Sequence, residues 1–286
     1  MRPSFYDPKL KYRLSIFDVE TEQLRPILVT DRLIEAPNWH PDGTVIVNCE
    51  GHLFQINPND PKLTAISIEN LEDLNNDHGI TPDGRSLIVS DSPFAGSSII
   101  YTVPYSGGIP SRVTHTSPSW WHGISPDGAT LVYTARRNGV FDIYNCPFDG
   151  GIEKRLTDGF DHTDGPDYTA DGAWIWFNGS RHGSMDLWRM RPDGTNLERM
   201  TSGTSVDWFP HPSPDGKTVL YLAYEEGTEG HPRNHNVELR LLRLKDGSET
   251  CLAQIFGGQG TINVPCWEPN SSRFAFVEVV KDGPFA

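Results

Sequence analysis

The sequence predicts an all-β protein, a six-bladed β-propeller with four-stranded antiparallel blades. A short turn phrase of the type PDG recurs six times, and a run of alternating apolar residues follows each copy. Successive steps are 41, 44, 44, 44 and 55 residues, counted between Pro41, Pro82, Pro126, Ala170, Pro214 and Pro269. A period of roughly 40 to 45 residues built from strand-like segments is typical of propeller blades.

Each repeat holds the segments that a four-stranded blade needs. In the second repeat the turn is followed by SLIVSD at 86–91, then by SIIYTV at 98–103 and by the short segment SRVT at 111–114. Alternating runs bounded by Gly, Asn, Asp and Pro indicate strands. In the PDG turn, Pro fixes φ, Asp bonds its own backbone and Gly accepts a positive φ. No segment has helical periodicity.

The two ends of the sequence complement each other. The last repeat has two predicted inner strands, near 264–267 and at 273–279, and the missing outer pair is found at 12–20 and 24–30. Closure of this kind removes free sheet edges. We therefore predict one domain over 1–286, with blades at about 31–69, 70–114, 115–157, 158–201, 202–254 and 255–286, the last completed by 10–30.

Charge and composition exclude several partners. A formal net charge of -14 argues against nucleic acid, which needs a basic footprint, and against anionic membrane surfaces. The sequence has no apolar run that would serve as a signal peptide or a membrane span, so we expect a cytoplasmic protein. None of the 4 cysteines has CxxC spacing, and a disulfide framework is not expected.

Two family resemblances follow from these motifs. The PDG phrase, the strand ending in DLWRM at 186–190 and DGTNLERMT at 193–201 resemble the TolB-like propeller (PD40) repeat, from residue 35 to the end. TolB binds other proteins of the cell envelope, so this resemblance implies a protein partner. The propeller and its histidines are also similar to oligogalacturonate lyase, in which histidines and a glutamine hold manganese above the channel. That resemblance implies a metal-dependent enzyme.

Histidines gather near the predicted propeller axis. Four residues before the reference position, four repeats have Pro whereas two have His78 and His122, and His211 lies one position later in its own repeat. Inner strands of different blades meet at the axis, so these imidazoles can converge on a divalent metal. The resemblance to oligogalacturonate lyase implies manganese, with zinc, iron, nickel or calcium as other candidates. The alternative is that they are polar channel-lining residues bonded to water or to each other.

The fifth repeat carries the longest insertion, at 225–240 between its second and third strands. We expect this loop on the same face as the histidines, with His231 or His235 as general base. Arg233 would orient a substrate, together with Arg181 of the preceding repeat. The alternative is a solvated hairpin extension.

Further side chains on this face are expected to bind substrate. Arginines on an acidic protein favour a small anionic or polyhydroxylated ligand, and aromatic rings stack on sugars, although such rings also pack between blades. The candidates are Trp120, Trp121, Arg136, Arg137, Asp164, Trp208 and Glu226.

Two functions fit these residues. The first is a metal-dependent enzyme that cleaves a uronide or an oxidised or keto sugar by β-elimination or hydrolysis. The alternative is a non-catalytic TolB-like propeller that binds a protein or peptide partner on the same face, with no metal and no titrating base. The histidines and the polar loop favour the enzyme, and the TolB-like repeat favours binding.

Overall fold

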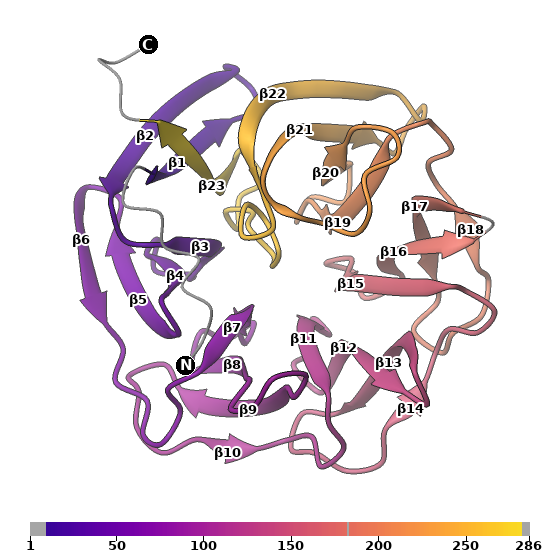
Figure 1. The fold of residues 1–286 in the computed structure, drawn as a ribbon, viewed down its shortest axis with the longest axis horizontal. Helices are drawn as coiled ribbons and strands as arrows, with labels where there is room; N and C mark the ends of the chain where they lie inside the picture. Colours follow the sequence, from indigo (N-terminus) through magenta and orange to yellow (C-terminus); the bar gives the residue numbers. More distant parts are fainter. Residues whose placement is uncertain (1–9, 182, 282–286) are drawn as a thin grey trace.

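The six predicted blades form a ring of antiparallel sheets around a central axis (Figure 1). A computed structural model describes residues 10–181 and 183–281. In these ranges every regular element is a strand, as the sequence predicts. The part of the chain that the structure describes contains no helix able to span a membrane.

The first three blades each have four strands, which follow one another from the axis outwards. Blade one is β3 (Ile34–Trp39), β4 (Val45–Cys49), β5 (His52–Asn57) and β6 (Asp60–Ala65). Blade two is β7 (Leu74–Ile80), β8 (Ser86–Asp91), β9 (Ile99–Pro104) and β10 (Ser111–Arg112). Blade three is β11 (Ser119–Ile124), β12 (Thr130–Arg137), β13 (Val140–Pro147) and β14 (Lys154–Arg155).

The next two blades repeat this order, and the sixth is assembled from both ends of the chain. Blade four is β15 (His162–Tyr168), β16 (Ile175–Arg181), β17 (Ser184–Met190) and β18 (Glu198–Arg199). Blade five is β19 (Val206–Pro212), β20 (Thr218–Tyr224), β21 (Arg233–Arg243) and β22 (Glu249–Gly258). Blade six contains β23 (Arg273–Lys281), β1 (Leu10–Asp18) and β2 (Gln23–Thr30).

Closure of the ring follows the predicted route. Strand β1 pairs with β23 over its whole length, from Leu10 opposite Lys281 to Asp18 opposite Arg273. The innermost segment of blade six is shorter than predicted. It is held by an isolated bridge between Trp267 and Phe274 and by a 2.9 Å bond from the Ala275 N–H to the carbonyl of Cys266.

The PDG turns repeat one set of hydrogen bonds. In four of these turns a Ser or Thr hydroxyl, two residues before the Asp, donates to that carboxylate at 2.5 to 2.7 Å. The following glycine has a positive φ each time, from 68° at Gly172 to 74° at Gly128. This end of each blade is therefore built by local backbone chemistry, as the sequence predicts.

The opposite ends of the inner strands are bulged. All five inner strands lose regular register there, for example between Asp164 and Asp167 in β15 and between Trp208 and His211 in β19. A β-bulge re-aims the side chains around it. Neighbouring blades join at these bulges, because the N–H of Phe209 donates to Asn178 Oδ1 of the preceding blade at 3.0 Å.

Apolar side chains fill the space between neighbouring blades. One buried cluster joins Trp208 and Leu220 of blade five to Phe274 and Phe276 of blade six. Cys49, Cys146 and Cys266 are buried in such interfaces, and all four cysteines are free thiols, as expected.

Candidate functional site

Asp164, at the bulged end of β15, lies at the centre of a cluster of histidines. Its Oδ1 accepts hydrogen bonds from Thr134 Oγ1 at 2.7 Å and from the Gly165 N–H at 2.8 Å, and lies 3.1 Å from His122 Nε2. Its Oδ2 faces His162 Nε2 at 3.7 Å and His231 Nε2 at 3.8 Å. Blades three and four and the blade-five loop therefore meet at one carboxylate.

The titration of this cluster is set by burial and by its own charges. Burial opposes ionisation of Asp164, but the neighbouring imidazoles of His122 and His162 hold the pKa of this carboxyl well below its usual value. Burial lowers the pKa of His122, but the carboxylates of Asp164 and Asp77 outweigh it and the net shift is upwards. Asp77, 4.0 Å from His122 Nε2, is buried and has its pKa raised to about 7.

Two of the imidazoles are fixed by aromatic packing. The ring of His162 stacks on Phe141 with centroids 4.6 Å apart. Trp208 is 1% exposed and meets His162 edge-on at 5.7 Å and His231 at 4.3 Å. Burial lowers the pKa of His231, which favours a neutral ring. The wall formed by Phe141 and Trp208 therefore presents both imidazoles to Asp164.

The local backbone at Asp164 requires glycine. Gly165 has a φ of +60°, and a Cβ built on it would lie 2.8 Å from Asn178 Oδ1 and 3.1 Å from a ring carbon of Phe209. Ala36 and Phe209 have a similar left-handed φ, 53° and 55°, at the corresponding bulges of their blades. The close approach to Asn178 and Phe209 is therefore what requires glycine at 165. The DG pair at 164–165 therefore turns the carboxylate towards the axis.

The histidines predicted to hold a metal have different surroundings. Both ring nitrogens of His211 have protein partners, Asp167 Oδ2 at 3.1 Å and the carbonyl of Ile262 at 2.7 Å. His78 is fully buried, which lowers its pKa to about 4, and neither ring nitrogen has a hydrogen-bond partner in the described chain. His122 belongs to the Asp164 cluster. These three residues thus present no common set of free donors, and we derive no step through a metal held by them.

A second polar group lies on the other side of the channel mouth. Arg233, the first residue of β21, forms an ion pair with Glu35 of blade one. The amide of Asn76, with its nitrogen directed at Glu35, donates to Oε2 at 3.0 Å and accepts from Arg233 Nη2 at 3.2 Å. Burial lowers the pKa of Arg233 to about 10. The blade-five insertion therefore reaches blade four through His231 and blade one through Arg233.

Two of the other predicted arginines make structural contacts. Arg181 lies over the ring of Phe160 at 4.3 Å and donates to the carbonyls of Gly159 and Asp158. Arg137 pairs with Glu153 at 2.7 Å. Among the described residues, neither guanidinium group contacts Asp164.

The remaining predicted residues divide between surface and core. Trp120 stacks on Phe141 at 5.6 Å, and Arg136 lies over that same ring at 5.4 Å, so these three extend the row that ends at His162. Trp121 is 1% exposed and packs beneath Gly79, as core. His235 is exposed and lies 6.1 Å from the ring of Tyr224, with no contact to Asp164 among the described residues.

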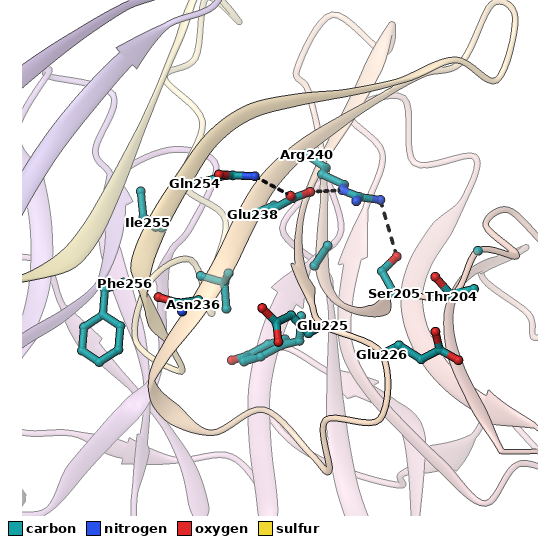
Figure 2. Close-up of a pocket in the computed structure, with 14 residues that line it drawn as sticks. Thr204, Ser205, Glu225, Glu226, Asn236, Glu238, Arg240, Gln254, Ile255 and Phe256 are labelled. Carbon is teal, nitrogen blue, oxygen red and sulfur yellow. Dashed lines mark hydrogen bonds and ion pairs between the residues drawn. The ribbon is translucent and has the colours of Figure 1, made fainter.

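A groove opens on blade five (Figure 2). One part, of about 820 Å³, is bounded by the loop before β19, the blade-five insertion and the β21–β22 hairpin. A second part, of about 490 Å³, continues over blade four and reaches Trp208. Residues 203–205 and Glu226 line both parts, so they form one continuous surface.

The groove has an acidic character. Arg240, which lines it, is neutralised by Glu238 at 2.7 Å, and Gln254 donates to the same carboxylate at 3.0 Å (Figure 2). Glu225 and Glu226 are exposed, and their carboxylates have no cationic partner among the described residues. The groove therefore offers uncompensated negative charge to a ligand.

Sequence reasoning missed two residues of these clusters. His162 lies before the positions that the comparison of repeats covered. Glu35 occupies the position of Asp164 in its own repeat, but its ion pair with Arg233 of blade five is not visible in the sequence. The sequence HTDG at 162–165 is a usable signal, because the glycine marks the turn that aims both side chains.

The fold and the site define a class of protein. It is a six-bladed β-propeller whose buried polar residues gather at the bulged ends of its inner strands. The sequence matches the TolB beta propeller domain (PD40) over residues 115–282. An uncharacterised protein of Agrobacterium fabrum is 43% identical over 270 residues, which is 94% of this chain and 92% of that one. The chain therefore belongs to the TolB β-propeller family.

Solved structures agree with this assignment. The structure of a TolB candidate from Agrobacterium tumefaciens superposes with a TM-score of 0.92 at 42% identity, covering 96% of this chain and 99% of that one. TolB from Acinetobacter baumannii gives a TM-score of 0.67 at 19% identity, over 88% and 65% of the two chains. At that identity the likeness concerns the fold.

The predicted resemblance to oligogalacturonate lyase is likewise one of fold. The lyase in complex with manganese has a TM-score of 0.56 and 13% identity, with 84% of this chain and 72% of that chain covered. This likeness gives no residue of the present chain a catalytic role.

Proposed function

We propose that this protein is a TolB-like binding propeller that captures a cationic, extended segment of a partner protein in the blade-five groove. The acidic groove is the observation that carries this proposal. Its two parts share residues 203–205 and Glu226, so a peptide can follow them continuously. Family membership supports a protein partner, and residence in the cytoplasm remains part of the proposal.

The chemistry of the groove selects the partner. The carboxylates of Glu225 and Glu226 attract Lys or Arg side chains, and the net charge of -14 adds a long-range field of the same sign. Ser205, Asn236 and Gln254 supply side-chain hydrogen bonds to a peptide. Each exposed charge pair contributes about 0.2 to 1 kcal/mol, so affinity should be modest and sensitive to salt.

Fluorescence anisotropy with short labelled peptides tests this proposal. A peptide of alternating Lys and Tyr should bind, and peptides in which Lys is replaced by Glu or Ser should bind more weakly. The double variant Glu225→Gln/Glu226→Gln should lower affinity for the Lys peptide by about three- to tenfold. The matched control is Glu22→Gln/Glu69→Gln, which removes two exposed charges elsewhere. Equal losses in both double variants, or equal binding of all peptides, would contradict the proposal.

A second candidate function is favoured by the row that leads to Asp164. The ring of Trp120 stacks on Phe141, and Phe141 stacks in turn on His162. The guanidinium of Arg136 lies over Phe141. A sugar ring can stack on such a row while the guanidinium binds its carboxylate. This arrangement suits a carbohydrate enzyme that cleaves a uronide or an oxidised or keto sugar, by hydrolysis or by β-elimination.

In the β-elimination version His231, held neutral by its burial, which lowers its pKa, takes the proton on the carbon next to the substrate carboxylate. The bond from the adjacent carbon to the leaving oxygen breaks, a double bond forms, and a protonated group of the cluster returns a proton to that oxygen. Incubation with oligogalacturonate and oligoglucuronate, with and without added divalent metal, tests this version through the ultraviolet absorbance of the unsaturated product. Turnover that is lost in His231→Ala supports it, and no turnover on either substrate contradicts it.

A further inference from the structure

The two oxygens of Asp164 have different surroundings. Oδ1 is saturated by Thr134, by the Gly165 N–H and by His122, all within 3.1 Å. Oδ2 faces the Nε2 atoms of His162 and His231, at 3.7 and 3.8 Å. These two separations exceed hydrogen-bonding distance, so in contrast to Oδ1 this oxygen is approached without being bonded.

The gaps around Oδ2 are slightly wider than the spacing between donor atoms that share a metal ion. In a metal site with bonds near 2.1 Å, neighbouring donor atoms lie roughly 3.0 to 3.5 Å apart. The separations of 3.7 and 3.8 Å exceed this range by a few tenths of an ångström. His162 Nε2 is buried and has no hydrogen-bond partner in the described chain. This nitrogen, which faces Oδ2, is therefore available to bind an ion.

From this geometry we propose that His162 Nε2, His231 Nε2 and Asp164 Oδ2 form a binding site for a first-row divalent transition-metal ion. Two imidazoles and one carboxylate, with further positions open, are a donor set for Fe²⁺ and related ions such as Co²⁺ and Zn²⁺. As the described side chains are placed, no group of three or more His, Cys, Asp and Glu has the spacing to hold a metal ion. Binding therefore requires small rotations that close the two gaps.

The surroundings position the donors for this role. Thr134 and the Gly165 N–H fix the carboxylate, as outer partners of metal ligands commonly do. Trp208 packs against both imidazoles and keeps their rings oriented. This site goes beyond both candidate functions, because His231 Nε2 bound to the ion cannot also take a substrate proton. The metal ligand and the His231 base are therefore alternative roles. The site differs from a metal on His78, His122 and His211, and it does not depend on peptide binding in the groove.

Titration of the metal-stripped full-length protein with Co²⁺, followed by its d–d absorption, tests the site. One equivalent should bind, Zn²⁺ should displace it, and Mg²⁺ and Ca²⁺, which prefer oxygen ligands, should not compete. His162→Ala, His231→Ala and Asp164→Asn should each weaken Co²⁺ binding at least about tenfold. Thr134→Val should weaken it by a smaller factor, because it only releases the carboxylate.

Two further variants keep the result interpretable. His115→Ala removes an exposed histidine outside the cluster and should leave Co²⁺ affinity unchanged. His211→Asn should also retain Co²⁺ binding. If this variant loses Co²⁺ binding, the ion is bound by His78, His122 and His211 instead, and the assignment is overturned. Thermal unfolding identifies any variant that has lost its fold. If His162→Ala is unfolded, the conservative variant His162→Gln is used in its place. If the unmodified protein binds neither Co²⁺ nor Zn²⁺, the metal site is overturned. The peptide-binding and turnover assays test the two proposed functions independently of that result.

Discussion

The two ends of the inner strands differ in what their residues do. At the PDG end, four blades repeat the same hydroxyl-to-carboxylate bond, and the carboxylates lie at the surface. At the bulged end, each blade has different side chains, and Asp77, Asp164 and His122 are largely buried against one another. The repeat thus builds the ring, and the departures from the repeat gather at one channel mouth, where the blade-five insertion joins them.

The largest expected difference between the two ends concerns glycine. Gly165→Ala should reduce the free energy of unfolding by roughly 3 kcal/mol, because the left-handed backbone and the contact with Asn178 Oδ1 both oppose a Cβ. Gly172→Ala, in a PDG turn with φ +68°, meets only Pro126 at 3.5 Å and should cost about 1 kcal/mol. Urea denaturation of both variants measures the contrast, and equal losses would show that the bulged end is not the tighter of the two.

Burial of an ionisable group gives the next effect. The pKa of His78 falls from 6.5 to about 4 on folding, so the folded state binds fewer protons than the unfolded state in this range. Stability should therefore be complete above pH 6.5 and should decline as the pH falls towards 4, by on the order of 3 kcal/mol from this residue. Comparison of the pH profile of unfolding with that of His78→Leu isolates this contribution. Parallel profiles would mean that His78 does not titrate as described.

The inter-blade hydrogen bond at the bulged end should be worth less. Asn178 Oδ1 accepts the Phe209 N–H, and Asn178 is fully buried. Asn178→Leu should leave this N–H without a partner and lower the free energy of unfolding by about 2 kcal/mol. Blade five has Leu222 at the equivalent position, so Leu222→Ile serves as a control with no such loss. A neutral Asn178→Leu would show that the blades are not joined through this bond.

The smallest effect is expected at the PDG end. The carboxylate of Asp171 accepts hydrogen bonds from Thr169 and from the Ala173 N–H at the surface, which lowers its pKa. Asp171→Ala should cost about 0.5 kcal/mol, because solvent replaces most of these bonds. A loss as large as that of Asn178→Leu would place the tightest local bonding at the turns instead.

The sequence predicts the fold well because the scaffold is local. The PDG turns, the period and the missing outer strands of blade six determine the number of blades and the route of closure, and these expectations are confirmed. The innermost segment near Trp267 is shorter than the sequence predicts. Its residue pattern resembles that of a strand, but only one bridge, between Trp267 and Phe274, forms there.

The site is predictable in part. The length of the fifth repeat reveals the blade-five insertion, which brings His231 and Arg233 to the channel mouth. His162 lies before the positions compared among the repeats. Glu35 escapes notice because its partner Arg233 belongs to another blade. Both ring nitrogens of His211 and of His122 are occupied, in part by the carbonyls of Ile262 and Asn263, and a sequence pattern does not contain that information.

The most direct test of partner binding exchanges the tip of the blade-five insertion. Replacing residues 225–230 by a Gly-Ser segment of equal length removes Glu225, Glu226 and Glu229 but keeps His231 and Arg233 with their partners. We predict an unchanged unfolding temperature and at least a roughly tenfold weaker binding of the Lys–Tyr peptide, measured by fluorescence anisotropy. Unchanged affinity for that peptide in a folded variant would contradict the claim that this loop forms the partner-binding face.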